Sequence, residues 1–406
     1  AYDFQLSDDE SKALFVTNVN YIYRHSFNAD YFVYDFATKS LKPLSPNGGQ
    51  RLATFSPDAS KIAFMRDNNL YITDLTTWEE TQFTEDGLYN HIINGAPDWV
   101  YEEEFGFAQG FFWSPDSKKI AYYKFDESKV REFEMEEFGG LYPDWYSFKY
   151  PKAGEDNSIV SVMVYNVESG KTIMMNTGEE TDIYLPRMKW TNDANILAIQ
   201  RLNRHQNHLE ILAANAETGE TTVFYDEENP YYIDITDDWE FLKDGKRFIM
   251  TSEKSGYNHI YICSLNGQEC KPLTSGEWDV TKIYGFDGKE VYFQAAKNSP
   301  IERQIYAVNL KGQVREIIGK EGTNNARFNN NFKYLINTNS TVTQPYQYAL
   351  YNNQGKMVRM LEDNHEFVEK MKEYNVSDKQ LIKINDPAFV LPDGTNVEID
   401  GWQILP

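Results

Sequence analysis

The segments FSPDASKIAFM, residues 55–65, and WSPDSKKIAYY, residues 113–123, decide the fold class of this chain. In each, an aromatic residue leads into a tight polar turn, and a hydrophobic strand follows. Ser-Pro-Asp is typical of a type I turn, because proline presets the backbone and short polar side chains bond to backbone groups nearby. Taken singly, each segment predicts a β-hairpin and nothing larger.

The same pattern recurs along the whole chain. Where no insertion intervenes, successive turns lie about 43 to 51 residues apart, which is the length of a four-stranded propeller blade. Isolated hairpins need no fixed period, so the repeat predicts an all-β chain that folds as a β-propeller. The further copies are LSDDESKALFV from Leu6, WTNDANILAIQ from Trp190, FLKDGKRFIM from Phe241, GFDGKEVYFQ from Gly285 and a degenerate copy, FNNNFKYLIN, from Phe328.

The repeat count leaves the number of blades open. Seven copies fit a seven-bladed ring or an eight-bladed ring without its first blade. Because the sequence begins directly on a turn-and-strand unit, we expect the second arrangement. We place the propeller at residues 1–390.

One interval between repeats is longer than the others. Residues 127–157 are rich in charge, glycine, proline and aromatic side chains, and we expect them to form an inserted arm. A mobile surface loop is the alternative. The aromatic side chains favour an ordered arm, because they need a surface to pack on, and long ordered loops are usually functional.

The composition sets limits on function. Hydrophobic residues make up 41% and aromatic residues 15% of the 406 residues, enough for a large core of half-buried strands. The formal net charge of -23 argues against nucleic acid as a partner and suits a cationic ligand. No run approaches the roughly 18 apolar residues of a membrane span, and the first ten residues lack the features of a secretory signal.

Several kinds of catalytic chemistry have no motif in this chain. The G-x-S-x-G turn of serine hydrolases, the H-E-x-x-H metal motif and the phosphate-binding glycine loops are all missing from the sequence. We therefore predict no catalytic residue, metal or cofactor here. The six histidines are expected to be structural residues in or beside strands; they are His25, His91, His205, His208, His259 and His365.

The segment NGAPDWVYEEEFGF, residues 94–107, stands out from the repeats. Pro97 and Asp98 predict the start of a helix, and Glu102, Glu103 and Glu104 follow in its first turns. A solvated acidic helix end is the simplest interpretation. The bulky aromatic residues on both sides favour partial burial, and packed carboxylates that repel one another form a natural receptor for a cation.

The stretch DWVYEEEF, residues 98–105, resembles the glutamate motif of the dipeptidyl peptidase IV family, and we identify the chain as a bacterial-type member. In that family the second and third glutamates hold the free amino terminus of a peptide, which implies Glu103 and Glu104 here. YIYRHSF, from Tyr21, resembles the stretch whose arginine contacts a substrate carbonyl, which implies Arg24. Further similar segments are WSPDSKKIAYYKFDES from Trp113, YPKAGE from Tyr150, RLNRHQN from Arg201 and GYNHIY from Gly256.

The resemblance implies an eight-bladed propeller that caps an α/β-hydrolase domain. Residues 391–406 are similar to the lead-in to that hydrolase, so the Ser, Asp and His of the triad are expected outside this chain, which alone should be inactive. The parent polypeptide would be a serine exopeptidase that releases amino-terminal dipeptides with Pro or Ala in second position. The arm occupies the place of the family's dimerisation arm, so a homodimer is expected.

Two other function classes stay open. One is a binding or scaffold propeller without a peptidase, for which an acidic surface would suffice. The other is a different prolyl oligopeptidase-type enzyme, such as an endopeptidase, although such enzymes have no use for paired glutamates that bind an amine.

The two cysteines lie in YICSLNGQEC, residues 261–270. Asn266-Gly267 reads as a two-residue hairpin turn, which would put Cys263 opposite Cys270 and allow a disulfide. The family has a bridge in a similar place with a longer loop, and a pair of buried thiols is the alternative. A bridge implies an exported protein, periplasmic or in the cell envelope.

Overall fold

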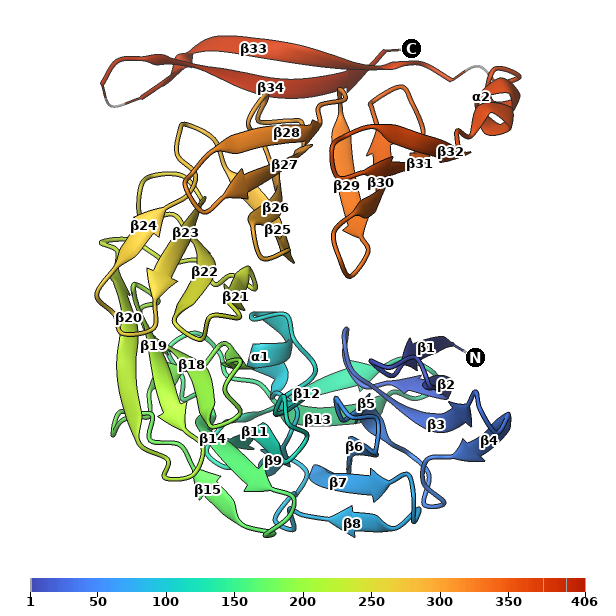
Figure 1. Ribbon diagram of the computed structural model, residues 1–406, viewed down its shortest axis with the longest axis vertical. Helices are drawn as coiled ribbons and strands as arrows, with labels where there is room; N and C mark the ends of the chain where they lie inside the picture. Colours follow the sequence, from blue (N-terminus) through green and yellow to red (C-terminus); the bar gives the residue numbers. More distant parts are fainter. Residues whose placement is uncertain (1, 375, 392, 406) are drawn as a thin grey trace. The chain divides into compact units, whose positions relative to one another are not determined.

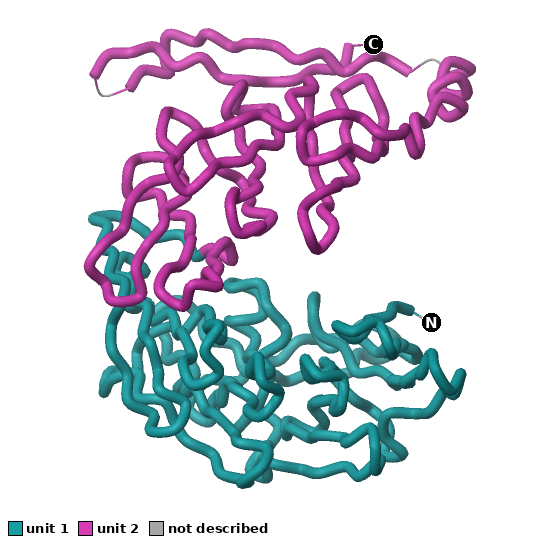
Figure 2. Tube along the Cα trace, viewed as in Figure 1, with its two compact units in different colours: residues 1–235 teal, residues 236–406 magenta. Residues whose placement is uncertain are grey.

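The structure, a computed structural model, describes residues 2–374, 376–391 and 393–405. Figure 1 shows the strands and helices of these residues and labels most of them. The chain divides into two compact units, Ala1–Ile235 and Thr236–Pro406, which Figure 2 colours separately. Each unit consists of antiparallel sheets whose strands follow one another in sequence order.

The described part of the first unit contains four such sheets and a separate two-stranded arm. In two of the sheets, a pair of short strands shares one edge of a longer strand. The sheets are β1 (Asp3–Leu6), β2 (Lys12–Tyr21), β3 (Phe27–Asp35) and β4 (Ser40–Pro43); β5 (Arg51–Phe55), β6 (Lys61–Arg66), β7 (Asn69–Asp74) and β8 (Glu80–Gln82); β9 (Ile92–Asn94), β10 (Phe111–Trp113), β11 (Lys119–Asp126), β14 (Ile159–Asn166) and β15 (Thr172–Met174); and β16 (Ile183–Tyr184), β17 (Met188–Trp190), β18 (Ile196–Asn203), β19 (His208–Asn215) and β20 (Thr221–Glu228).

The second unit has three four-stranded sheets, one hairpin and one helix among its described residues. These are β21 (Trp239–Phe241), β22 (Arg247–Ser252), β23 (His259–Ser264) and β24 (Cys270–Pro272); β25 (Val280–Phe286), β26 (Glu290–Ala295), β27 (Gln304–Asn309) and β28 (Val314–Ile318); β29 (Thr323–Phe328), β30 (Tyr334–Ser340), β31 (Gln347–Asn352) and β32 (Met357–Glu362); α2 (His365–Met371); and the hairpin of β33 (Lys379–Val390) and β34 (Asn396–Ile404).

The repeat seen in the sequence coincides with the turn between the first two main strands of each sheet. In the second sheet, Ser56 Oγ donates a hydrogen bond to Asp58 Oδ1 at 2.6 Å and accepts one from the backbone N–H of Lys61 at 3.0 Å. Ser114 makes the matching bonds in the third sheet, at 2.6 and 2.9 Å. The Ser-Pro-Asp pattern recurs because one hydroxyl closes the turn and also fixes the start of the next strand.

Several inner strands, among them β6, β11 and β22, are buried on both faces, so they do not alternate between apolar and polar residues. In β6, for example, Ile62, Ala63, Phe64 and Met65 are all buried. Strands buried on both faces are nearly continuous in hydrophobicity. This explains why the repeat is visible in the sequence as a polar turn followed by an unbroken apolar run.

The expected arm contains β12 (Glu132–Glu137) and β13 (Asp144–Lys149), which pair as an antiparallel hairpin. Four large side chains at and beside its tip are exposed: Phe138, Leu141, Tyr142 and Trp145. The boundary that we placed at residue 390 falls in the turn of the β33–β34 hairpin. The assignment of residues 391–406 to a hydrolase stays a prediction.

Cys263 and Cys270 lie opposite each other in the β23–β24 register, and a disulfide joins them. The turn differs from the expected one. The N–H of Gly267 bonds to the carbonyl oxygen of Ser264 at 3.1 Å, so the central residues are Leu265 and Asn266. Only Gly267 of these three has a positive φ, 72°. A two-residue Asn-Gly turn would need a positive φ at Asn266 as well.

Two of the six histidines, His208 and His259, lie in strands, and His25, His91 and His205 lie beside strands, as expected. His365 begins helix α2, which follows β32. No helix among the described residues is long and apolar enough to cross a membrane.

Candidate functional site

The predicted helix is α1 (Trp99–Glu103), in the first unit, and Asp98 caps it as expected. Asp98 Oδ1 accepts a hydrogen bond from the N–H of Tyr101 at 2.9 Å, and Asp98 Oδ2 accepts one from Ser158 Oγ at 2.6 Å. Burial raises the pKa of the Asp98 carboxyl, while both hydrogen bonds act in the opposite direction. Since Ser158 precedes β14, the cap fixes the start of α1 against the third sheet.

Tyr101 anchors the helix in the core and is only 1% exposed. Its hydroxyl accepts a hydrogen bond from the N–H of Leu185 at 2.9 Å. Its ring lies 5.0 Å from that of Phe105 and 4.9 Å from that of Phe125, between centroids. The aromatic residues around the glutamates therefore bury one side of the segment, in agreement with the partial burial that the sequence predicted.

The three glutamates do not form one cluster. Successive residues of a helix point about 100° apart, so neighbouring side chains face different surroundings. Glu102 is fully buried, Glu103 is half-buried and Glu104 is exposed. Their carboxylate oxygens do not lie together as a single group. The three carboxylates therefore do not pack as one group, and the assignment of an amino terminus to Glu103 and Glu104 stays a prediction.

Glu102 faces the segment between β2 and β3. Its Oε1 accepts a hydrogen bond from the backbone N–H of His25 at 2.9 Å. This bond joins two segments 77 positions apart in the sequence and fixes the residue next to Arg24. The sequence pattern did not distinguish Glu102 from the other two glutamates. The helical period would have shown that its side chain points in a different direction from those of Glu103 and Glu104.

Arg24 lies beside Glu103 in the structure, as the family resemblance implied for two residues of one site. Arg24 Nε is 3.3 Å from Glu103 Oε2. The Arg24 side chain is 73% exposed and that of Glu103 only 16% exposed. The guanidinium of Arg24 therefore lies mostly in solvent, next to a carboxylate that is mostly buried. The Nη groups of Arg24 form no hydrogen bond within the described ranges and can donate to a ligand.

Glu104, the next residue of the chain, lines a pocket that contains neither Arg24 nor Glu103. This pocket has a volume of about 290 Å³ and lies within the first unit. Arg187 also lines this pocket, and its Nη2 donates to the carbonyl oxygen of Phe105 at 2.8 Å. No hydrogen bond or ion pair joins Glu104 to Arg24 or Glu103 in the part of the chain that the structure describes. The remaining lining residues are Val100, Phe105, Tyr184, Gln206, Tyr232, Asp234 and Ile235.

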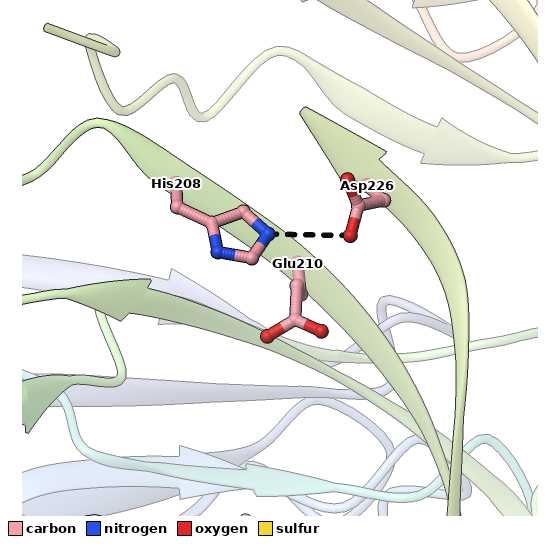
Figure 3. Close-up of side chains that lie close together, drawn as sticks. All are labelled: His208, Glu210 and Asp226. Carbon is pink, nitrogen blue, oxygen red and sulfur yellow. Dashed lines mark hydrogen bonds and ion pairs between the residues drawn. The ribbon is translucent and has the colours of Figure 1, made fainter. Parts of the chain in front are cut away.

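A second polar cluster was not visible in the sequence. His208 and Glu210 on β19 lie close to Asp226 on β20, with one potential ligand atom of each within 4.8 Å of the others (Figure 3). His208 Nε2 is 3.2 Å from Asp226 Oδ2. Arg201 donates two hydrogen bonds to Glu210 Oε2, at 2.8 and 2.6 Å. Because Arg201 already supplies the positive charge, we assign no metal to this cluster.

The repeated antiparallel meanders, with an acidic helix inserted between β9 and β10 of the third sheet, are typical of a propeller domain with an insertion. A model of the dipeptidyl peptidase IV (DPP IV) N-terminal region matches residues 7–346. The chain belongs to this family. The resemblance drawn from DWVYEEEF and the β-propeller fold class are thereby confirmed.

Individual relatives agree with the family assignment. Dipeptidyl peptidase 4 of Trichophyton equinum is 31% identical over 421 residues, which cover 98% of this chain and 53% of that protein. The crystal structure of Porphyromonas gingivalis dipeptidyl peptidase 4 has 37% identity and a TM-score of 0.94 over 99% of this chain and 57% of that chain. The chain thus spans about half the length of these relatives.

Proposed function

We propose that this chain is the substrate-anchoring propeller of a serine-type dipeptidyl peptidase that removes dipeptides from peptides with a free amino terminus. Pro or Ala would stand second in the substrate. The observation that carries the proposal is the pairing of Arg24 with Glu103 at 3.3 Å, with Glu104 at the next position of the chain. A binding scaffold would need no such pairing of a carboxylate with an exposed arginine.

In this mechanism Glu103 and Glu104 hold the substrate's ammonium through charge-assisted hydrogen bonds. An α-amino group has a pKa of about 7.7 to 8.0 and is largely protonated at neutral pH. Arg24 uses Nε toward Glu103, so its Nη groups donate to a backbone carbonyl of the substrate. Fixing the amino terminus fixes the distance to a nucleophile on another domain, which makes the enzyme an exopeptidase.

The direct test compares a proline-containing peptide with its amino-terminally acetylated form, using the full-length polypeptide. Acetylation removes the charge that the glutamates bind, so kcat/KM should fall at least about thirtyfold. Equal cleavage of the two peptides would reject the exopeptidase function.

We expect the chain of residues 1–406 alone to leave a dipeptidyl-proline reporter uncleaved, because its sequence has no nucleophile motif and the anchoring residues only position substrate. The measurement is reporter release by purified chain. The full-length polypeptide serves as the positive control. Turnover that follows the chain through further purification would contradict the assignment of catalysis to another part of the polypeptide.

The arm and the cysteines support two further parts of the proposal. The exposed side chains of Phe138, Leu141 and Tyr142 at the arm's tip fit a contact with a second copy of the polypeptide. The Cys263–Cys270 bridge fits an exported protein in the periplasm or cell envelope.

A further inference from the structure

A second cavity of the first unit lies at the start of α1, on the side of Asp98 and Trp99. Its volume is about 440 Å³, within the range of sites for small molecules. Besides the start of α1 and Glu127 after β11, its lining comes from the β2–β3 segment, the start of β5, the β6–β7 turn, the loop before β9 and the arm strand β13. None of the residues assigned to peptide anchoring lines it.

Glu127 is a buried carboxylate on the wall of this cavity, with 5% of its surface exposed. Its carboxylate accepts no hydrogen bond and forms no ion pair with any residue that the structure describes. Burial raises the pKa of Glu127 to about 7, the charges of Asp98, Asp126 and Glu132 add to this, and Lys149 opposes it. A buried charge without a partner is costly, so the site favours a bound cation.

Lys149 does not serve as that cation. Its Nζ donates a hydrogen bond to the carbonyl oxygen of Val130 at 2.8 Å and lies 3.5 Å from Glu132 Oε1. The ammonium of Lys149 therefore already interacts with two residues of the arm segment. The carboxylate of Glu127 remains available to accept a hydrogen bond from a ligand.

Arg51 is the complementary group on the same wall. Its Nε is buried and has no hydrogen-bond partner, and its guanidinium forms no ion pair within the described residues. Burial lowers the pKa of Arg51, and the charge of Glu102 acts in the opposite direction. The negative charge of Glu102 partly offsets the positive charge of Arg51, but Glu102 accepts no hydrogen bond from the N–H groups of Arg51. The cavity thus holds an unused acceptor and an unused donor of opposite charge.

The rest of the lining combines aromatic and apolar side chains with polar ones, the latter being Asn28, Asp67, Asn68, Asn90 and Asp98. Tyr23, Tyr89 and Tyr146 line the cavity together with Trp99 and Ile93. Ring faces attract ammonium groups, and apolar side chains exclude water from both charges. Among the described lining residues, no three His, Cys, Asp or Glu ligand atoms lie together as a metal site, so the cavity suits an organic ligand with an aliphatic part better than a metal ion.

We infer that this cavity binds a small zwitterion, a free α-amino acid or a dipeptide, with its ammonium at Glu127 and its carboxylate at Arg51. The inference is independent of the proposed peptide anchoring, because the two sites share no residue. The ligand would contact Trp99 and Asp98, in the first turn of the helix that carries Glu103.

Calorimetric titration of the full-length polypeptide tests the inference, in a Glu104→Gln background that weakens binding at the peptide anchor. The probes are L-leucine and L-alanyl-L-proline, with N-acetyl-L-leucine and L-leucinamide as analogues that each lack one charge. We expect one zwitterion to bind and the matching analogues to bind about thirtyfold more weakly or worse. Binding of leucine alone identifies a free amino acid as the ligand, and binding of the dipeptide alone identifies a peptide product.

Glu127→Gln and Arg51→Gln should each abolish this binding, while Glu136→Gln on the exposed face of the arm should not affect it. A thermal readout keeps the test valid if one variant folds poorly. Without ligand, Glu127→Gln should melt at a higher temperature than the parent at pH 8, where the parent carboxyl is ionised in both the folded and the unfolded state. This difference should shrink as the pH falls below 7 and disappear only below about pH 4, where the carboxyl is protonated in both states.

Two results would overturn the inference. One is no binding of either zwitterion up to about 10 mM, a concentration that reveals even millimolar affinity, which would mean that the cavity holds water only. The other is binding that persists in both Glu127→Gln and Arg51→Gln, which would locate the ligand elsewhere.

Discussion

Replacing Glu103 or Glu104 by glutamine in the full-length polypeptide should lower kcat/KM for peptides with a free amino terminus by about thirtyfold to several-thousandfold. The reason is that a bound substrate would cover the charged pairs between its ammonium and the glutamates, and loss of one partner from a covered charged pair costs about 2–5 kcal/mol. Steady-state rates at neutral pH, where the substrate amine is largely protonated, provide the measurement. Acetylated peptides should lose little more in the variants than they already lose in the parent.

Two controls separate substrate anchoring from a general defect. A small acylating reagent that needs no amine should modify the nucleophile equally fast in the variants and the parent, because the anchoring residues do not take part in the chemical step. Glu136→Gln, on the exposed arm, should behave as the parent. If Glu104→Gln left kcat/KM unchanged while Glu103→Gln lowered it, the anchor would be Glu103 alone.

Tyr101→Ala should destabilise the protein by about 3–5 kcal/mol, as expected for removing a large aromatic side chain from a core. Tyr101 is 1% exposed and packs on Phe105 and Phe125. The change is measured as a lower urea midpoint at unchanged m-value. Tyr101→Phe is the matched variant: it keeps the ring and should cost about 1–3 kcal/mol, because the N–H of Leu185 loses its acceptor.

The difference between the two Tyr101 variants is the informative quantity. If Tyr101→Phe were as damaging as Tyr101→Ala, the hydrogen bond to Leu185 rather than the ring would hold α1 in the core. If both were harmless, α1 would be only loosely attached to the third and fourth sheets.

Local signals explain what could be predicted from the sequence. The Ser-Pro-Asp turn is closed by bonds among residues only a few positions apart, so each copy marks its own strand pair. Asp98 likewise caps α1 through the N–H of Tyr101, three residues on. Repetition of such local units along the chain was enough to predict the β-propeller.

What could not be predicted depends on contacts between distant segments. The hydrogen bond that holds Glu102 against the segment between β2 and β3 depends on the position of His25, 77 residues earlier. The cluster at His208 needs the register of β19 with β20, which brings Asp226 alongside. The cavity at Glu127 and Arg51 forms only where the arm meets the loop before β9. Spacing along one segment contains none of this information.

The hydrogen bond between Glu102 and position 25 has a consequence for sequence divergence. The donor is the main-chain N–H, so the hydrogen bond requires only a peptide N–H at this position and does not involve the side chain of His25. Homologous positions can drift among nineteen amino acids without releasing the neighbouring arginine, and proline alone is excluded, because it has no N–H to offer. Constraint at this point of the site therefore falls on the acidic residue, while its partner position is free to vary.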